Sequence, residues 1–316
     1  MYYVGVDIGG TGIKAGIVNA EGKVLLRSSI PTDRSFDPYV ISDDIAAQIK
    51  DLFTKAGIKT EEVAGIGVGV PGAINSTTGV VDYNNNLHWS RFPLSKELSA
   101  RTGLRVKISN DANVAALGEA KFGAGKDYHD SVMVTLGTGV GGGVIIDNKL
   151  FEGNEGKGTE LGHMVIRVGG EQCSCGRKGC LEAYASATAL IRDTRRAMEK
   201  NKDSAMWKYS PKLEDVNGLT AFECSKKGDK AAQKVVDDYI ESLGEGLVNF
   251  INIFRPQAIM LGGGVCGQGD YLLKPLTKFV KDNTYGGDVI PPTEITIATL
   301  ANNAGLIGAA SLVMED

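Results

Sequence analysis

The chain opens with Tyr2-Tyr3-Val4-Gly5-Val6-Asp7-Ile8-Gly9-Gly10-Thr11-Gly12-Ile13-Lys14-Ala15-Gly16-Ile17-Val18. Two segments of this stretch, Tyr2–Ile8 and Ile13–Val18, have the composition of strands, and a glycine-rich break separates them. We therefore predict a β-hairpin with a glycine-rich tip. The tip offers unhindered backbone N–H groups, a threonine hydroxyl and the Lys14 cation, which are groups that bind phosphate. A simple glycine turn without a ligand is the alternative.

The same pattern returns in the middle of the chain. Ser131–Leu136 and Val140–Ile146 read as strands on either side of Gly137-Thr138-Gly139. Two similar hairpins indicate a duplicated domain, with one glycine hairpin in each half. A third glycine cluster, Gly262-Gly263-Gly264, follows a predicted strand at Gln257–Leu261. Three glycine turns at strand ends predict two phosphate loops and one seat for a nucleoside.

Composition places the chain among soluble globular proteins and excludes several partners. Its 316 residues suit two domains, and apolar and charged residues make up 42% and 23%. The net charge of −4 argues against nucleic acid as a partner. No apolar run is long enough to span a membrane, and the first residues lack the features of a signal peptide. We therefore expect a cytoplasmic protein that binds neither nucleic acid nor membrane.

Strands and helices alternate along the rest of the chain, which predicts an α/β fold. Further strands are predicted at 64–70, 105–109 and 295–300. Apolar residues at helical spacing, together with glycine stops, predict helices. The predicted helices span residues 41–56, 94–102, 111–122, 181–200, 230–254 and 304–314.

One histidine and three cysteines lie within eighteen residues and have the residue types of a metal site. They are His163, Cys173, Cys175 and Cys180. In a reducing compartment, clustered cysteines are more often metal ligands than disulfides, and Cys₃His is a ligand set for structural zinc. A loop of free thiols and a catalytic zinc with an open position are the alternatives. The two remaining cysteines, Cys224 and Cys266, are expected to be buried packing residues.

Two carboxylates at strand ends are candidates for chemistry. Asp7 precedes the first glycine turn and is suited to hold Mg²⁺ near phosphates, or merely to cap the turn. Asp111 follows a predicted strand, where ligands gather in α/β sheets, and is suited to act as a general base. The alternative for Asn110-Asp111 is a plain N-cap of the next helix.

These motifs together resemble the ROK family of sugar kinases and related repressors, within the actin/hexokinase/Hsp70-like ATPase superfamily. The resemblance covers nearly the whole chain and is closest to the bacterial glucokinases of the family. The residues that carry it are Asp7-Ile8-Gly9-Gly10-Thr11, Asn110-Asp111-Ala112-Asn113, Gly137-Thr138-Gly139-Val140-Gly141-Gly142-Gly143, Glu160-Leu161-Gly162-His163, Cys173-Ser174-Cys175-Gly176-Arg177-Lys178-Gly179-Cys180-Leu181-Glu182 and Ala301-Asn302-Asn303-Ala304-Gly305-Leu306-Ile307-Gly308-Ala309-Ala310.

The resemblance implies an α/β fold of two actin-like (ribonuclease H-like) domains with a ligand cleft between them. The expected boundaries are residues 1–120 for the smaller domain and 121–302 for the larger domain with its zinc loop. Residues 303–316 would form a closing helix that returns to the smaller domain.

The resemblance also implies ATP-dependent phosphorylation of a hexose at its 6-hydroxyl, with glucose favoured because Ala73 is small and apolar. Asp111 would be the base, and zinc on His163 and the three cysteines would be structural. The expected sugar ligands are Gly72, Asn110, Asp111, Glu160, His163 and Glu182. The expected ATP ligands, with Mg²⁺, are Asp7, Gly9, Gly10, Thr11, Gly12, Lys14, Gly137, Thr138, Gly139, Gly262, Gly263 and Gly264.

Other members of the family suggest alternatives. N-acetylmannosamine or N-acetylglucosamine kinase and fructokinase are the alternative enzymes, and polyphosphate is an alternative donor. A sugar-responsive repressor is less favoured because the first hairpin begins at Asp7, which leaves no room for a helix-turn-helix domain. A non-catalytic sugar-binding scaffold is disfavoured by the phosphate loops. Relatives imply a homo-oligomer, either a dimer or a tetramer.

Overall fold

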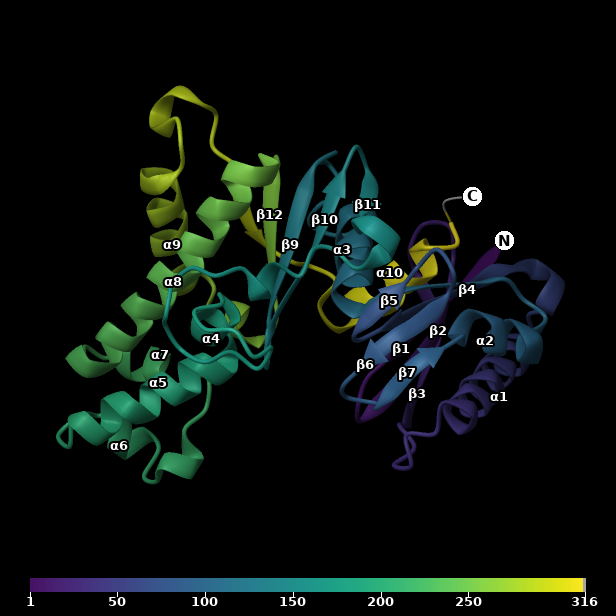
Figure 1. The fold of residues 1–316 in the computed structure, drawn as a ribbon, viewed down its shortest axis with the longest axis horizontal. Helices are drawn as coiled ribbons and strands as arrows, with labels where there is room; N and C mark the ends of the chain where they lie inside the picture. The colour runs from purple at the N-terminus through teal and green to yellow at the C-terminus, as the bar shows by residue number, and fades with distance from the viewer. Residues whose placement is uncertain (315–316) are drawn as a thin grey trace. The chain divides into compact units, whose positions relative to one another are not determined.

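The computed structural model describes residues 1–314 and divides into two compact units (Figure 1). Unit 1 comprises Met1–Met133, Gly143–Thr159 and the chain from Ala298 onward. Unit 2 comprises Val134–Gly142 and Glu160–Ile297. This division follows internal contacts, and the domain boundaries expected at residues 120 and 302 stay a prediction.

The first sheet contains the predicted glycine hairpin. Its strands are ordered β3-β2-β1-β4-β8. β1 pairs antiparallel with β2, and β2 with β3, whereas β4 is parallel to both β1 and β8. The bounds are β1 Tyr2–Ile8, β2 Gly12–Val18, β3 Val24–Pro31, β4 Val63–Val70 and β8 Val106–Asn110.

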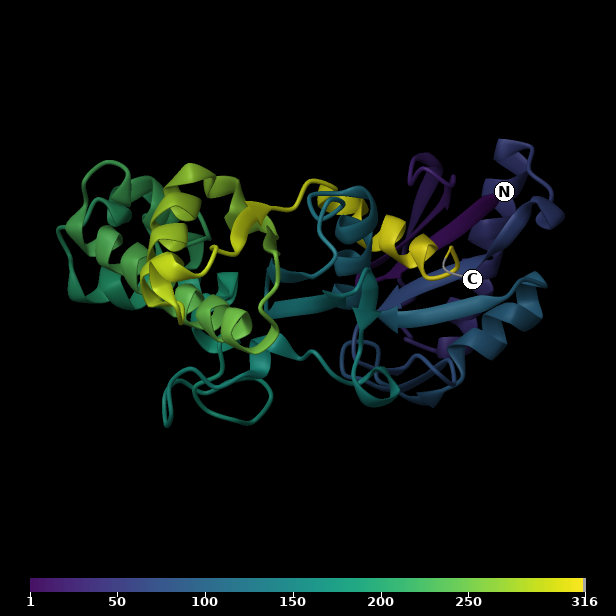
Figure 2. The ribbon, with the colours of Figure 1, turned by 90° about the horizontal axis from the view of Figure 1, so that it is seen from above.

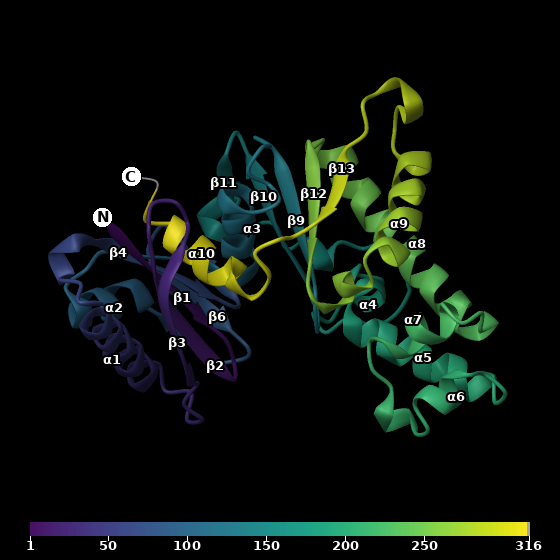
Figure 3. The ribbon, with the colours of Figure 1, turned by 180° about the vertical axis from the view of Figure 1, so that it is seen from behind.

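The second sheet repeats the strand order of the first. Its order is β11-β10-β9-β12-β13, so both sheets read third, second, first, fourth, fifth strand along the chain. Figure 3 shows β12 and β13 side by side, and they pair in parallel. This repetition agrees with the duplication predicted from the glycine hairpins, and the mixed α/β fold is confirmed. The bounds are β9 Ser131–Leu136, β10 Val140–Ile146, β11 Lys149–Phe151, β12 Ala258–Gly262 and β13 Glu294–Ile297.

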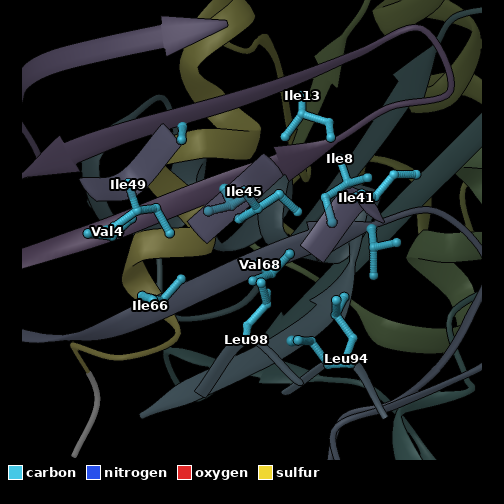
Figure 4. Packing of buried hydrophobic residues seen from close by; sticks show 14 of the residues in the cluster. Val4, Ile8, Ile13, Ile41, Ile45, Ile49, Ile66, Val68, Leu94 and Leu98 are labelled. Carbon is cyan, nitrogen blue, oxygen red and sulfur yellow. The ribbon is translucent and has the colours of Figure 1, made fainter. Parts of the chain in front are cut away.

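Two helices, α1 (Pro38–Ala56) and α2 (Leu94–Thr102), cover one face of the first sheet. Asp37 caps α1 by accepting hydrogen bonds from the N–H groups of Tyr39 and Val40, and Gly57 ends the helix at φ 66°. The helices and strands share one apolar core (Figure 4). Burial of each aliphatic side chain there contributes about 1.5–3 kcal/mol. Its members include Val4, Val6, Ile8, Ile41, Ile45, Ile49, Ile66, Val68, Leu94 and Leu98.

The opposite face of this sheet lacks side chains where helix α10 (Ala304–Ser311) crosses it. Gly5 alternates with Val4 and Val6, so it faces away from α1. A Cβ on Gly5 would lie 1.9 Å from the Leu306 carbonyl oxygen, and a Cβ on Gly67 would lie 1.7 Å from that of Ala309. Glycine is therefore required in both strands for the backbone of α10 to reach the sheet.

Unit 2 is richer in helices, which gather in one group, coloured from teal through green to yellow in Figure 2. The sequence predicts one helix over residues 181–200, and this prediction is wrong. Ser186 interrupts it at ψ 161°, and its side chain accepts a hydrogen bond from the Ala189 N–H as the N-cap of a new helix. The bounds are α4 Glu182–Ala185, α5 Ala187–Lys200, α6 Met206–Tyr209, α7 Thr220–Ser225, α8 Lys230–Phe254 and α9 Asp270–Asn283.

The strand predicted at residues 295–300 is also too long. β13 ends at Ile297. The next N–H groups serve a different partner, because those of Thr299 and Leu300 donate to the buried Glu119 carboxylate at 3.0 and 2.6 Å. Glu119 lies on α3 (Asp111–Phe122), so this acceptor holds the chain leading into α10 against α3.

Unit 1 also holds a three-stranded sheet that the sequence did not predict. It consists of β5 (Ala73–Asn75), β6 (Val80–Asn84) and β7 (Trp89–Phe92), in that order. Within residues 1–314, no helix has the length and apolar character that crossing a membrane requires.

Candidate functional site

The four expected zinc ligands come together in unit 2. The side-chain donor atoms of His163, Cys173, Cys175 and Cys180 all lie within 4.8 Å of one another. His163 Nδ1 is 3.6 Å from Cys173 Sγ, and the sulfurs of Cys175 and Cys180 are 3.7 Å apart. A tetrahedral site with zinc–sulfur bonds of about 2.3 Å requires sulfur–sulfur distances of about 3.8 Å. The geometry of this cluster is therefore compatible with one tetrahedral zinc ion.

The chemistry of these thiols also fits a metal. All five cysteines are free, so no disulfide competes for the three in the cluster. Burial raises the pKa of the Cys180 thiol to about 12, and burial likewise raises the pKa of Cys173. Hydrogen bonding from the Arg177 backbone lowers the pKa of Cys175, the exposed member. A bound cation would stabilise the thiolates and release their protons. Cys224 and Cys266 are buried elsewhere, as the sequence predicts.

Glu182, an expected sugar ligand, lies beside this cysteine cluster. Its Oε1 accepts a hydrogen bond from Ser174 Oγ at 2.8 Å, and Cys173 Sγ lies 3.5 Å from the same oxygen. Its Oε2 accepts from the Val140 N–H at 3.2 Å. The carboxylate thus joins the cysteine loop to the start of β10. Because each carboxylate oxygen has two acceptor sites, Glu182 keeps capacity for a ligand hydroxyl.

The second glycine turn and the third glycine cluster also meet within unit 2. Gly263 has φ 100°, and a Cβ there would lie 2.2 Å from the Leu136 carbonyl oxygen, immediately before the turn. The turn itself is braced by α5, because the Ala187 N–H donates to Gly137 O at 2.8 Å and Thr188 Oγ1 donates to Thr138 O at 2.8 Å. Six of the expected ATP ligands are therefore grouped here: Gly137, Thr138, Gly139, Gly262, Gly263 and Gly264.

The other six expected ATP ligands form the first hairpin tip in unit 1. The Gly9 N–H donates to Gly12 O at 2.9 Å, which closes the tip. Thr32, immediately after β3, fixes the tip, because its Oγ1 donates to Gly9 O at 2.6 Å. Asp7 and Lys14 pair across the strands, with Lys14 Nζ 3.3 Å from Asp7 Oδ2. Gly10 and Thr11 lie between them at the tip.

Asp111 is the first residue of α3, immediately after β8. The N-cap of this helix is Asn110, whose Oδ1 accepts hydrogen bonds from the N–H groups of Ala112 and Asn113. The Ala112 N–H also donates to Asp111 Oδ1 at 3.0 Å. Asn110 is therefore the N-cap, and the exposed Asp111 carboxylate stands at the positive end of the helix dipole. Asn110 Nδ2 donates to the carbonyl oxygen of Gly72 at 3.2 Å. This bond groups three of the expected sugar ligands in unit 1.

Glu160 and His163 are the remaining expected sugar ligands, and they flank a single turn. The His163 N–H donates to Glu160 O at 3.0 Å. Gly162 between them lies against β10, because a Cβ there would be 1.9 Å from the Val140 carbonyl oxygen. Within unit 2, this turn and Glu182 therefore both contact the start of β10 at Val140.

Comparison with known proteins gives consistent results. The sequence matches the ROK family over residues 3–316. A glucokinase of Thermotoga maritima is 36% identical over 313 residues, which are 99% of this chain and 97% of that protein. A glucokinase of Streptomyces coelicolor is 37% identical over 315 residues, with coverage of 99% and 97%.

Solved structures of ROK family proteins are also similar to this chain. A ROK family glucokinase from Streptomyces griseus, in complex with glucose and AMPPNP, superposes with a TM-score of 0.83. It is 34% identical, and 100% of each chain is covered. Repressors are less similar in sequence: the xylose repressor of Caldicellulosiruptor bescii is 29% identical, and the match covers 78% of its length.

Proposed function

The chain belongs to the ROK family, and we propose that it transfers the γ-phosphoryl group of ATP to the 6-hydroxyl of glucose. The observation that carries this proposal is the similarity to glucokinases at 36–37% identity over 99% of the chain. A structural neighbour that covers 100% of the chain binds glucose and the ATP analogue AMPPNP. The chain is therefore a glucokinase of the ROK type.

A function as a transcriptional repressor is less well supported. Xylose repressors are 27–30% identical, and this chain matches only 77–78% of their length. In contrast, glucokinases are matched over 95–97% of their length. The sequence identity to the glucokinases is thus higher, and the match covers more of their length.

Asp111 acts as the general base in this proposal. It would take the proton of the sugar hydroxyl as that oxygen attacks the γ-phosphorus of ATP, and such a base contributes about 10²–10⁴-fold. The exposed position of the Asp111 carboxylate at the N-terminus of α3, next to the N-cap Asn110, supports this role. Asn110 and Gly72, joined by their hydrogen bond, would contact the sugar from the same edge of unit 1.

The glycine turns would hold the triphosphate. Their N–H groups suit phosphate oxygens, and phosphoryl transfer requires mainly positioning and neutralised charge. Gly9–Gly12, with Lys14, and Gly137–Gly139 would bind phosphates, and Gly262–Gly264 would line the adenosine. Asp7 would hold Mg²⁺, an ion that prefers oxygen ligands and supplies charge neutralisation at the phosphates. Lys14 Nζ pairs with Asp7 Oδ2 at 3.3 Å, and the exposed Lys14 side chain can give up this pairing when the ion binds.

The cysteine cluster would hold a structural zinc ion. His163 approaches the cysteines with Nδ1, so its Nε2 stays available for a sugar hydroxyl. Zinc on Nδ1 would fix both the ring orientation and the tautomer, as outer partners do at other metal sites. Glu160 and Glu182 would bind further hydroxyls, which accept and donate at once and so suit carboxylates. A reducing cytoplasm, where ATP is supplied, would keep the thiols free for the metal.

A panel of hexoses tests the proposal. Glucose, fructose, mannose and the two N-acetylhexosamines are each offered with ATP and Mg²⁺, and kcat/KM is compared. Glucose is expected to give the highest value, partly because Ala73 offers no side-chain donor to an acetamide. A parallel arm with polyphosphate identifies the donor. Failure of every hexose to be phosphorylated would contradict the proposal and favour a regulatory role.

A further inference from the structure

Glu152 joins β8, which ends next to the proposed base, to the chain just after β5. This half-buried residue lies just after β11 and belongs to no motif. Its Oε2 accepts a hydrogen bond from Ser76 Oγ at 3.0 Å, just after β5. Its Oε1 accepts a short hydrogen bond from Ser109 Oγ, on β8. Ser109 is 0% exposed, so water cannot replace the carboxylate as its partner.

The segment that follows Glu152 is fastened to unit 1 along its length. Gly156 lies so close to β5 that a Cβ on it would be 2.8 Å from the Ile74 carbonyl oxygen. Lys157 pairs with Asp82 of β6 at 2.6 Å. Thr159 Oγ1 donates to Asn113 Oδ1, in the first turn of α3, at 3.1 Å. The segment 152–159 is therefore a tether that contacts β5, β6 and α3.

The tether bonds to residues on both sides of Asp111 in the sequence. Ser109 precedes Asp111 by two residues, and Asn113 follows it by two residues. We propose that Glu152 is a positioning residue for Asp111: by binding Ser109 and Ser76 together, its carboxylate fixes the end of β8 from which the base projects. This proposal rests on the proposed function, in which Asp111 is the base.

The loss of this positioning should lower the reaction rate by an amount that can be measured. A displacement of about 1 Å at a reacting group can lower the rate about 10²-fold. Removal of the Glu152 carboxylate leaves the buried Ser109 hydroxyl without its acceptor, and the end of β8 must then shift to find another. Sugar binding relies on several other groups, so the effect should fall on kcat more than on KM.

The test compares Glu152→Ala, Glu152→Gln and Ser109→Ala with the unaltered chain. Glu155→Gln is the matched control, because Glu155 lies in the same tether but is exposed, and its carboxylate pairs with the Lys157 side chain. Each variant is assayed for glucose phosphorylation across pH, and amide hydrogen exchange is followed for residues 106–116. Glu152→Ala is expected to lower kcat about 10- to 100-fold, to change the KM for glucose less than about threefold, and to speed exchange in that segment.

The conservative variant separates positioning from simple stability. A glutamine at position 152 can accept from one serine and donate to the other, so Glu152→Gln should recover most of the lost kcat, and Ser109→Ala should lose kcat while keeping Glu152. An unchanged kcat and unchanged exchange in Glu152→Ala would overturn the proposal, as would equal losses in Glu155→Gln. If the unaltered chain phosphorylates no hexose, the proposed function fails, and the exchange data still decide whether Glu152 holds the end of β8.

Discussion

Glu182 and Val140 are joined by a hydrogen bond from the Val140 N–H to Glu182 Oε2, at 3.2 Å. The other oxygen of this carboxylate binds Ser174, within the cysteine loop. A single side chain therefore ties the proposed zinc loop to the end of the second glycine turn. One residue therefore contacts both parts of unit 2 that would serve the sugar and the phosphates, in addition to the bonds from α5 that brace the turn.

Substitution of Gly139 tests this connection. A Cβ at Gly139 would lie 2.3 Å from Glu182 Oε2, so Gly139→Ala must push the carboxylate away from Val140. We expect kcat/KM for glucose to fall by about tenfold or more, because the geometry of the binding groups is lost. The thermal stability should change little, since a flexible side chain can move.

The control for this substitution is Gly218→Ala. Gly218 has no positive φ, and no atom lies within 4 Å of its Cβ position. Its substitution should leave kcat/KM unchanged. Retention of full activity in Gly139→Ala would show that Glu182 does not act at the position that this hydrogen bond defines.

Elements with a local signal were predictable from the sequence. The glycine hairpin at Tyr2–Val18 and the helix from Lys230 to Phe254 have regular patterns, and both form. Ser186 also has a local signal, because a serine is a good N-cap even within an apparently continuous helix. The early end of β13 was not predictable, since it depends on Glu119, which is 180 residues away from Thr299 in sequence.

The candidate site shows the same difference between local and distant contacts. His163 and the three cysteines are close in sequence, and their residue types alone indicated a cluster. Glu152 escaped prediction because its partners Ser76 and Ser109 are 76 and 43 residues away, and a glutamate after a strand has no distinctive pattern. Only the folded chain brings these three side chains together.

Gly67→Ala tests the packing of α10 on the first sheet. A Cβ at Gly67 would lie 1.7 Å from the Ala309 carbonyl oxygen, and a backbone atom cannot move aside as a side chain can. We expect the free energy of unfolding to fall by about 1–3 kcal/mol or more, as for other overpacked positions. Urea denaturation measures the change. Gly218→Ala should stay within about 0.5 kcal/mol of the unaltered chain. Equal stability of the two variants would contradict this packing.

Zinc content tests the cysteine cluster. We expect about one zinc ion per chain by elemental analysis. Cys175→Ser should lower that content strongly, because it removes a ligand at the exposed side of the cluster. Cys224→Ser, which changes a buried cysteine outside the cluster, should leave it unchanged. A fully active and stable protein without metal would contradict the zinc proposal.

The pH dependence of the free energy of unfolding distinguishes the metal-free form of the cysteine cluster from the zinc-bound form. Burial raises the pKa of Cys180 from 9.0 to about 12, so the folded metal-free protein favours the neutral thiol. Its contribution to stability is complete below about pH 9 and is lost as the pH rises toward 12. The metal-bound form has the opposite dependence, because protons displace zinc from the thiolates as the pH falls. When unfolding is measured with a chelator, the stability should therefore fall only above about pH 9. Without the chelator, it should rise as the pH increases from about 6 toward 9.

Asp111→Asn tests the proposed base directly. The asparagine keeps the size of the side chain but cannot take a proton, so kcat should fall about 10²-fold or more, while glucose still binds. Calorimetry of glucose binding and a steady-state assay measure the two quantities separately. Asp51→Asn is the matched control, because Asp51 lies on the surface of α1 in a pair with Lys55. Its activity should equal that of the unaltered chain. Near-normal turnover in Asp111→Asn would remove Asp111 as the base, and the loss of glucose binding together with turnover would assign it to substrate binding alone.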